Sequence, residues 1–218
     1  MKVLVIGSGG REHALIWKLR QSTSVHTVYC APGNGGIGDL AELVPIPPSD
    51  HEALAAFAKG NRIDLTVVGP EQPLVEGIVD QFQSEGLRVF GPTRAAARLE
   101  GSKAFAKAFM ERHGIPTARH AGFTRENLSG AGRFIEELSG HVVVKADGLA
   151  AGKGVIICSN GREALRVVED MIEGGAFGEA GRHVVVEEFL DGEEASILAL
   201  TDGERYVCLT PAQDHKRI

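Results

Sequence analysis

Two glycine-rich segments contain residues that could bind phosphate. The first is GSGGRE at residues 7–12, which follows the apolar run at residues 3–6 and opens a helical pattern. Backbone N–H groups at the start of a helix favour an anionic phosphate. A dinucleotide fingerprint would need glycine at position 12, where the chain has Glu12, so the segment favours a single phosphate over a nicotinamide dinucleotide. A tight turn that binds nothing is the alternative.

The second segment is KADGLAAGKG at residues 145–154, which joins two predicted strands. It differs from a Walker A loop because Lys153 is followed by Gly154 instead of serine or threonine. A glycine-rich hairpin with a lysine near each end could fold over a triphosphate as a flap, with Lys145 and the backbone N–H groups neutralising phosphate oxygens. The alternative is a solvated hairpin without a ligand.

Two acidic segments follow predicted strands. In VVVEEFLDGEEAS, at residues 184–196, a buried strand emerges at Glu187 and Glu188. Such a segment could offer edge hydrogen bonds to a base and a carboxylate to a ribose, or it could be an exposed acidic turn. In VVGPEQPLV, Glu71 either faces the loop at residues 7–11 and holds a polar ligand, or complements the dipole of a helix that starts there.

The composition excludes several classes of protein. The 218 residues include 23 Lys and Arg against 29 Asp and Glu, and this net charge of −6, with 6% aromatics, argues against nucleic-acid binding. No apolar run approaches the ~18 residues of a membrane span. Cys30, Cys158 and Cys208 lie far apart, as expected for reduced thiols in a cytoplasmic protein.

Strands and helices alternate over the first hundred residues. Apolar runs predict strands at residues 3–6, 26–30, 63–68 and 88–90, a capping box at Ser49 and Glu52 predicts one helix, and Pro73 predicts the start of another. Repeated units of this kind predict an α/β domain with a doubly wound parallel sheet, which binds ligands at the carboxyl ends of its strands.

The pattern changes near residue 102. A helix is expected at residues 102–113, an extended piece at 121–123, a helix around Ile135, strands at 141–146 and 155–158, a helix capped by Asn160, and strands at 183–189, 195–201 and 205–209. We therefore expect an α/β domain at 1–102, a linking helix and connector at 103–124, an α+β subdomain carrying the flap at 125–190, and the start of a second subdomain at 191–218.

The motifs in combination closely resemble the glycinamide ribonucleotide synthetase family of the ATP-grasp superfamily. The resemblance spans essentially the whole chain and rests on VLVIGSGGREHAL, APGNGG, VVGPEQPLV, FGPT, LEGSKAF, VVVKADGLAAGKGVII, VVVEEFLDGEEAS and QDHKR. It implies a ligase of purine biosynthesis with an incomplete α+β ATP-grasp region after the α/β domain. Such an enzyme cleaves ATP to join glycine to 5-phosphoribosylamine through a glycyl phosphate.

The resemblance also implies roles for individual residues. Lys103 and Lys145 are the expected phosphate contacts, the backbone of Glu187, Glu188 and Leu190 is expected to read adenine, and Glu194 is expected to bind the ribose. The full ATP-binding set is Lys103, Lys145, Gly148, Gly152, Lys153, Gly154, Glu187, Glu188, Leu190 and Glu194. The substrate-binding set is Gly9, Gly10, Arg11, Glu12, Glu71, Asp214 and Lys216. Individual roles for Asp214, His215 and Lys216 do not follow from it.

Members of this family are longer than 218 residues. The resemblance places the ligands for Mg²⁺ or Mn²⁺ beyond residue 218, with none in this chain, and implies that the chain alone does not catalyse the ligation. Two alternatives stay open: another purine-pathway ATP-grasp ligase, such as a carboxylase or a formate-dependent transformylase, and a non-catalytic module that binds a nucleotide or phosphate. The sequence does not determine the oligomeric state.

Overall fold

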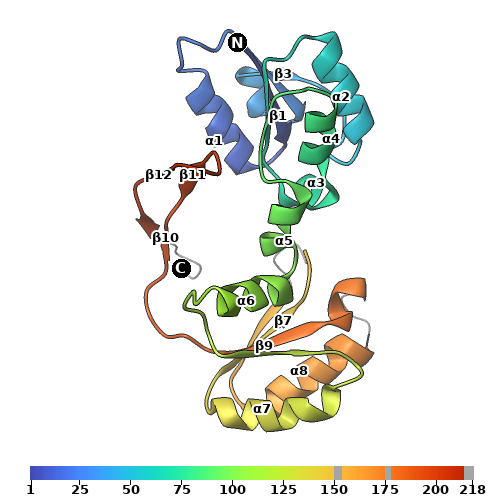
Figure 1. The fold of residues 1–218 in the computed structure, drawn as a ribbon, viewed down its shortest axis with the longest axis vertical. Coiled ribbons are helices and arrows are strands. Elements are labelled where there is room, and N and C mark those ends of the chain that lie inside the picture. The colour runs from blue at the N-terminus through green and yellow to red at the C-terminus, as the bar shows by residue number, and fades with distance from the viewer. Residues whose placement is uncertain (150–153, 175–177, 214–218) are drawn as a thin grey trace.

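The computed structural model describes residues 1–149, 154–174 and 178–213. Two units, each built around its own sheet, lie at opposite ends of the molecule in Figure 1 and are joined through helices α5 (Arg94–Gly101) and α6 (Lys103–Arg112). The division of the chain into the four ranges given above stays a prediction.

The first unit is built on a parallel sheet. Its strands lie in the order β3-β2-β1-β4-β5, and every adjacent pair is parallel. The strands are β1 (Lys2–Gly7), β2 (Thr27–Pro32), β3 (Glu42–Leu43), β4 (Leu65–Val68) and β5 (Val89–Phe90). Residues 3–6 of the central strand are fully buried, which explains their continuous apolar run.

Helices cover both faces of this sheet. They are α1 (Gly10–Leu19), α2 (His51–Gly60), α3 (Glu71–Glu76) and α4 (Ile78–Ser84), with a 3₁₀ turn at Ile37–Asp39. Val3 and Val5 pack against Ile16 of α1 on one face, whereas Leu4 and Ile6 belong to a core with α2 and α4 on the other. The predicted doubly wound sheet is therefore confirmed. The strand order reverses between β1 and β4, so their carboxyl ends form the switch point at which such sheets bind ligands.

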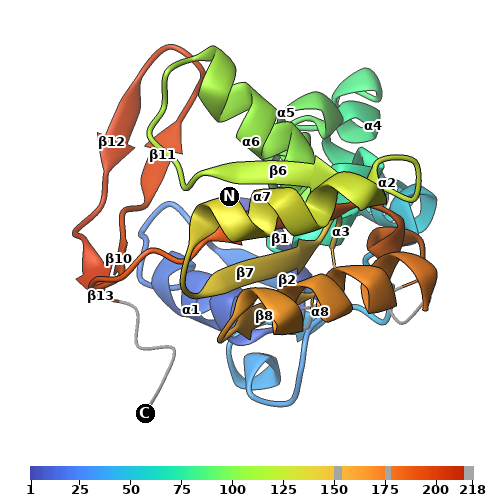
Figure 2. The ribbon, with the colours of Figure 1, turned by 90° about the horizontal axis from the view of Figure 1, so that it is seen from below.

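The second unit contains an antiparallel sheet in the order β6-β9-β7-β8. The strands are β6 (His120–Phe123), β7 (Val142–Ala146), β8 (Val155–Cys158) and β9 (Val184–Glu188). Figure 2 shows α7 (Ala131–Leu138) and α8 (Gly161–Glu173) side by side on one face, and Figure 1 shows α6 on the other. Short 3₁₀ turns lie at Leu128–Gly130 and Gly178–Arg182.

After β9 the chain forms two small antiparallel pairs with exposed residues. β10 (Ala195–Ser196) pairs with β13 (Ala212–Gln213), and β11 (Ala199–Thr201) pairs with β12 (Tyr206–Cys208). An α+β region thus follows the parallel sheet, as predicted. No helix in the described part of the chain is long and apolar enough to cross a membrane.

Several local predictions were wrong. Asp50, not Ser49, caps α2, because its Oδ1 accepts a hydrogen bond from Ala53 N at 3.0 Å. The helix expected from Pro73 is two helices, because Gly77 adopts φ of +95° between α3 and α4. The strand expected at 195–201 is split into β10 and β11. Helix α5 and strand β3 were not anticipated.

Candidate functional site

Strand alternation puts Lys145 and Glu187 on the same face of the second sheet. Val142, Val144 and Ala146 belong to the core beneath α7 and α8, so Lys145 points to the opposite face. Lys145 is paired with Val185 in the register of β7 and β9, which makes Glu187 its diagonal neighbour. Lys145 Nζ donates a hydrogen bond to Glu187 Oε2 at 2.8 Å. A carboxylate therefore meets the ammonium at the end of this valine-rich strand.

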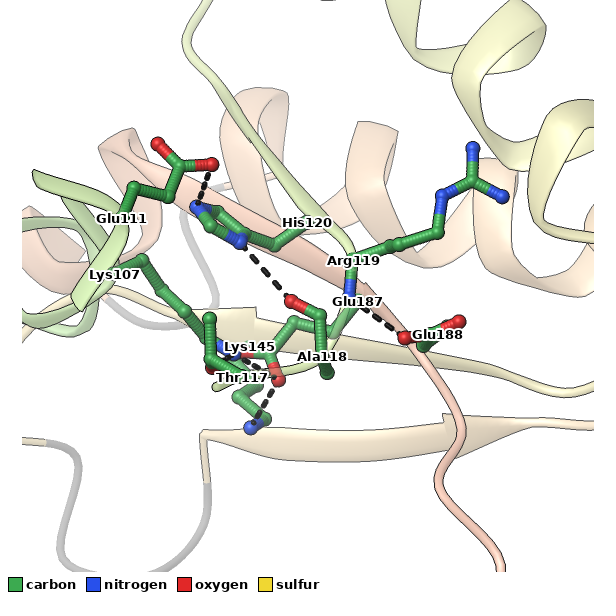
Figure 3. A network of polar contacts seen from close by, with 9 residues as sticks. All are labelled: Lys107, Glu111, Thr117, Ala118, Arg119, His120, Lys145, Glu187 and Glu188. Atoms are coloured by element: carbon green, nitrogen blue, oxygen red, sulfur yellow. Dashed lines mark hydrogen bonds and ion pairs between the residues drawn. The ribbon is translucent and has the colours of Figure 1, made fainter. Parts of the chain in front are cut away.

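A second lysine reaches the same carboxylate from helix α6 (Figure 3). Lys107 Nζ lies 3.0 Å from Glu187 Oε2 and donates a hydrogen bond to Thr117 Oγ1 at 2.7 Å. The side chains of Lys107 and Glu187 are only 9% and 5% exposed, against 26% for Lys145. The other carboxylate oxygen, Glu187 Oε1, is buried and has no hydrogen-bond partner.

The start of the glycine-rich loop is attached to the N-terminus of α6. Asp147 accepts hydrogen bonds from Ser102 Oγ at 3.0 Å and from Ala104 N at 3.1 Å, and Lys103 Nζ donates to Gly148 O at 2.9 Å. The bond from Ala104 N satisfies a backbone donor at the helix start. Together these contacts hold Lys103 and the strand that carries Lys145 in one arrangement.

Arg11 and Glu71 meet at the switch point of the first sheet. Arg11 Nη1 donates to Glu71 Oε1 at 2.8 Å. This hydrogen bond is the main cause that lowers the pKa of Glu71 below its ordinary value, with a backbone hydrogen bond next in weight. Glu71 is also the first residue of α3. Glu71 therefore lies both at the start of a helix and opposite the loop at residues 7–11, so its position agrees with both interpretations.

Glu12 lies inside the switch point. It is 3% exposed, and its Oε2 accepts a hydrogen bond from Gly9 N at 2.6 Å. A Cβ atom at Gly7 would lie 2.7 Å from the Glu12 carboxyl carbon, and one at Gly69 would lie 2.6 Å from it. The two glycines, at the ends of β1 and β4, therefore create the space that this carboxyl group fills.

Replacing Gly69 with alanine should lower the free energy of unfolding by about 1–3 kcal/mol, because the new methyl group collides with the buried carboxyl of Glu12. Urea denaturation measures this change. Gly10→Ala is the matched control: nothing lies within 4 Å of its Cβ position, and a change within about 0.5 kcal/mol is expected. Equal losses in the two variants would contradict the packing argument.

One cavity of about 1080 Å³ connects these groups. Arg11 and Glu71 line it from the first unit, and Lys103, Lys107, Lys145 and Glu187 line it from the second. Apolar side chains complete its lining, among them Met110, Val143, Leu149, Val155, Ile157, Phe189 and Leu190. An apolar surface beside three lysines suits a ligand with a flat, apolar part and an anionic part.

Most of the described candidate residues line this cavity. They are Arg11, Glu71, Lys103, Lys145, Gly148, Gly154, Glu187, Glu188, Leu190 and Glu194. Gly9 and Gly10 lie beside Arg11 at the start of α1, whereas the Glu12 carboxyl faces inward. The predictions for Gly152, Lys153, Asp214 and Lys216, and the unassigned His215, fall outside the described residues.

Lys107, Thr117 and Asp147 are site residues that the sequence interpretation did not single out. Lys107 stands four residues after Lys103 on α6, so both side chains lie on one face of that helix. This spacing is the signal that could have indicated Lys107. Its partner Glu187 is 80 positions further along the chain, and only the fold brings them together.

The described residues do not provide a metal site. Within residues 1–149, 154–174 and 178–213, no group of three or more His, Cys, Asp or Glu side chains could hold a metal ion. Three carboxylates of the cavity are engaged with cations or backbone groups: Glu71 with Arg11, Glu187 with two lysines, and Glu188 with Arg119 N at 2.8 Å.

Two family models cover the entire chain. Residues 1–100 match "Phosphoribosylglycinamide synthetase, N domain", and residues 101–218 match "Phosphoribosylglycinamide synthetase, ATP-grasp (A) domain". The chain belongs to the phosphoribosylglycinamide synthetase family. The fold class predicted above, an α/β domain followed by an ATP-grasp region, agrees with this assignment.

Curated relatives of this chain are phosphoribosylamine–glycine ligases. The phosphoribosylamine–glycine ligases of Escherichia coli K12 and of Vibrio cholerae are each 54% identical over 220 residues. The alignments cover 100% of this chain and 51% of each relative. The chain thus spans about half the length of the curated relatives it matches.

Solved structures agree with the fold. Phosphoribosylamine–glycine ligase from Thermotoga maritima, at 34% identity, matches with a TM-score of 0.80 over 100% of this chain and 51% of that one. N5-carboxyaminoimidazole synthetase from Staphylococcus aureus, solved with ADP, matches with a TM-score of 0.73 over 99% of this chain and 54% of that one. At 15% identity the second match supports the fold alone.

Proposed function

We propose that this chain supplies the ATP site and the phosphoribosylamine site of a phosphoribosylamine–glycine ligase. The observation that carries the proposal is the cavity of about 1080 Å³, which joins Arg11 at the switch point to Lys103 and Lys145 beside the glycine-rich loop. The names of the relatives support the same activity. The activity of the whole enzyme, with glycine, 5-phosphoribosylamine and ATP as substrates, belongs to the proposal.

ATP fits the part of the cavity formed by the second unit. The adenine would lie against the apolar residues of β7 and β8, beside the backbone of Glu187, Glu188 and Leu190, where edge hydrogen bonds are available. Glu194, which also lines the cavity, would serve the ribose. Lys103 and Lys145 would neutralise phosphate oxygens, together with the loop that starts at Gly148.

5-Phosphoribosylamine fits the part of the cavity next to the first sheet. The first-turn N–H groups of α1, at Gly10 and Arg11, are suited to a phosphate group, and the Arg11 guanidinium adds a charged donor. Gly9 lies next to them as the N-cap, with its own N–H donated to Glu12. Glu71 holds that guanidinium in place. The phosphate of one substrate would then lie at one end of the cavity and the triphosphate of the other toward the opposite end.

The proposed reaction has two steps. A carboxylate oxygen of glycine attacks the γ-phosphorus of ATP and ADP leaves, which gives glycyl phosphate. The amine of 5-phosphoribosylamine then attacks the glycyl carbonyl carbon, phosphate leaves and a proton is lost. The residues of this chain would act by orienting the substrates and neutralising phosphate charge.

The proposal also covers a metal ion and the location of the protein. A divalent cation, Mg²⁺ or Mn²⁺, would accompany the ATP, and the 2-oxoglutarate carboxylase domain that shares this fold was solved with MgADP. Cytoplasmic location is proposed from the three free cysteines.

Calorimetric titration of the 218-residue chain tests the proposal. We expect ATP to bind, GTP to bind at least about ten-fold more weakly because the base is read by edge hydrogen bonds, and glycinamide ribonucleotide, the stable product, to bind as well. Arg11→Ala should weaken binding of glycinamide ribonucleotide but not of ATP, while Arg133→Ala, an exposed arginine on α7, should change neither. A chain that binds no adenine nucleotide would contradict the proposal.

A further inference from the structure

Lys107 is a buried lysine, and the proposed function assigns no role to it. Its Nζ lies 3.0 Å from Glu187 Oε2, and Lys145 Nζ lies 2.8 Å from the same oxygen. Two ammonium groups therefore share one carboxylate oxygen (Figure 3), and all three side chains line the cavity. A single lysine would suffice to neutralise Glu187, so the second one needs an explanation.

The two lysines differ in how firmly they are held. Lys107 is 9% exposed and is anchored by a second hydrogen bond, to Thr117 Oγ1 at 2.7 Å. Lys145 is 26% exposed and lines the cavity from β7, next to the glycine-rich loop. Lys145 can thus turn its ammonium group toward a ligand in the cavity, whereas Lys107 stays with Glu187.

The cost of that movement depends on Lys107. If Lys145 were the sole cation at Glu187, moving it to a phosphate would leave a carboxylate with a 5% exposed side chain unpaired, and an unpaired buried charge is strongly unfavourable. With Lys107 in place, the carboxylate keeps a cation after Lys145 has moved. The side chains of Lys107, Lys145 and Glu187 together carry a formal charge of +1 before a ligand binds, and this charge also favours the binding of an anion.

We propose that Lys107 is a positioning residue that keeps Glu187 neutralised, so that Lys145 can transfer its hydrogen bond from this carboxylate to a phosphate of the bound nucleotide. The inference rests on the proposed function, because it needs ATP in the cavity. Lys107 itself would not touch the nucleotide.

A purely structural role for Lys107 makes a different prediction. In that case the lysine would only attach α6 to β9, and its removal would weaken the binding of every ligand in the cavity in similar proportion. A positioning role affects the phosphate end alone. Adenosine, which has the base and ribose but no phosphate, separates the two.

The experiment measures affinities of the 218-residue chain for ATP by calorimetry and for adenosine by equilibrium dialysis. Lys107→Met should weaken ATP binding about 10- to 100-fold, as expected for the loss of one charge-assisted hydrogen bond to phosphate, and leave adenosine affinity unchanged. Lys107→Arg should restore most of the ATP affinity. Lys59→Met, which removes an exposed lysine paired with Glu85, is the control for a lost positive charge.

A double variant gives the sharpest test. In Lys107→Met/Glu187→Gln one positive and one negative charge are removed together, so Lys145 is no longer held by an anion. ATP affinity should then be higher than in Lys107→Met alone, although a second cavity residue has been changed. If Lys107→Met does not fold, the double variant, whose buried charges are balanced, is compared with the wild type, and an ATP affinity more than about 10-fold below that of the wild type overturns the inference.

The outcomes are distinct. The inference is overturned if Lys107→Met binds ATP like the wild type, if it loses ATP and adenosine affinity in equal proportion, or if the double variant binds ATP no better than Lys107→Met. If the wild-type chain binds neither ATP nor ADP, the proposed function fails first and the inference fails with it. Wild-type ATP binding with an unaffected Lys107→Met leaves the proposed function intact and removes the inference alone.

Discussion

Replacing Lys145 with methionine should reduce the affinity of the chain for ATP by about 100-fold or more, since the variant loses a charge-assisted hydrogen bond to phosphate together with the positive charge beside it. Glu187 keeps Lys107 as its cation in this variant, at 3.0 Å. The fold should therefore survive, and the free energy of unfolding should change by no more than about 1 kcal/mol. Calorimetric titration with ATP and urea denaturation measure the two quantities.

The matched control for this variant is Lys59→Met. Lys59 forms an ion pair with Glu85 at 2.9 Å on the surface, away from the cavity. Both substitutions remove one lysine from a carboxylate partner, so a difference in ATP affinity reports the place of Lys145 and not the loss of charge in general. Near-normal ATP binding by Lys145→Met would show that Lys145 serves Glu187 and not the nucleotide.

The main strands were predictable because burial leaves a direct mark on the sequence. Residues 3–6 are apolar without interruption, and the structure buries all four in the central strand of a parallel sheet. Val142 and Val144 of β7 likewise pack beneath α7 and α8. The cap of α8 was also predicted, and Asn160 Oδ1 accepts a hydrogen bond from Glu163 N at 3.0 Å.

The missed and misplaced elements have local causes. Helix α5 has the sequence RAAARLEG, in which Ala97 is the buried residue and Leu99 the one large apolar residue, so no group of large apolar side chains marks it in the sequence. The break at Gly77 was hidden because Val75, Ile78, Val79 and Phe82 keep a helical spacing across it. Glycine allows the positive φ there, but the sequence pattern does not require it.

The polar centre of the site was only half predictable. The motifs indicated Lys145 and Glu187 separately, but nothing local to either residue shows that they form an ion pair. That contact depends on the register between β7 and β9. Lys107 was harder still, because a lysine on a helix is usually solvated, and its burial depends on how α6 packs over β9.

Glu187→Ala should be the most destabilising of the substitutions considered for this site, with a loss of about 3–5 kcal/mol in the free energy of unfolding. The carboxylate holds two ammonium groups within 3.0 Å, and its removal leaves Lys107, 9% exposed, facing Lys145 without an intervening negative charge. Burial of an uncompensated charge and repulsion between like charges act in the same direction. Urea denaturation followed by circular dichroism measures the loss.

Two further variants decide whether charge is the cause. Glu85→Ala removes the partner of Lys59 and should cost no more than about 1 kcal/mol, because the Glu85 side chain is 29% exposed and water still solvates the Lys59 ammonium. Adding Lys107→Met to Glu187→Ala removes the buried charge that Glu187→Ala left unpaired, so the double variant should be more stable than Glu187→Ala. If the second substitution instead lowers stability further, Glu187 stabilises the fold by packing, and the shared carboxylate is not the electrostatic centre of the site.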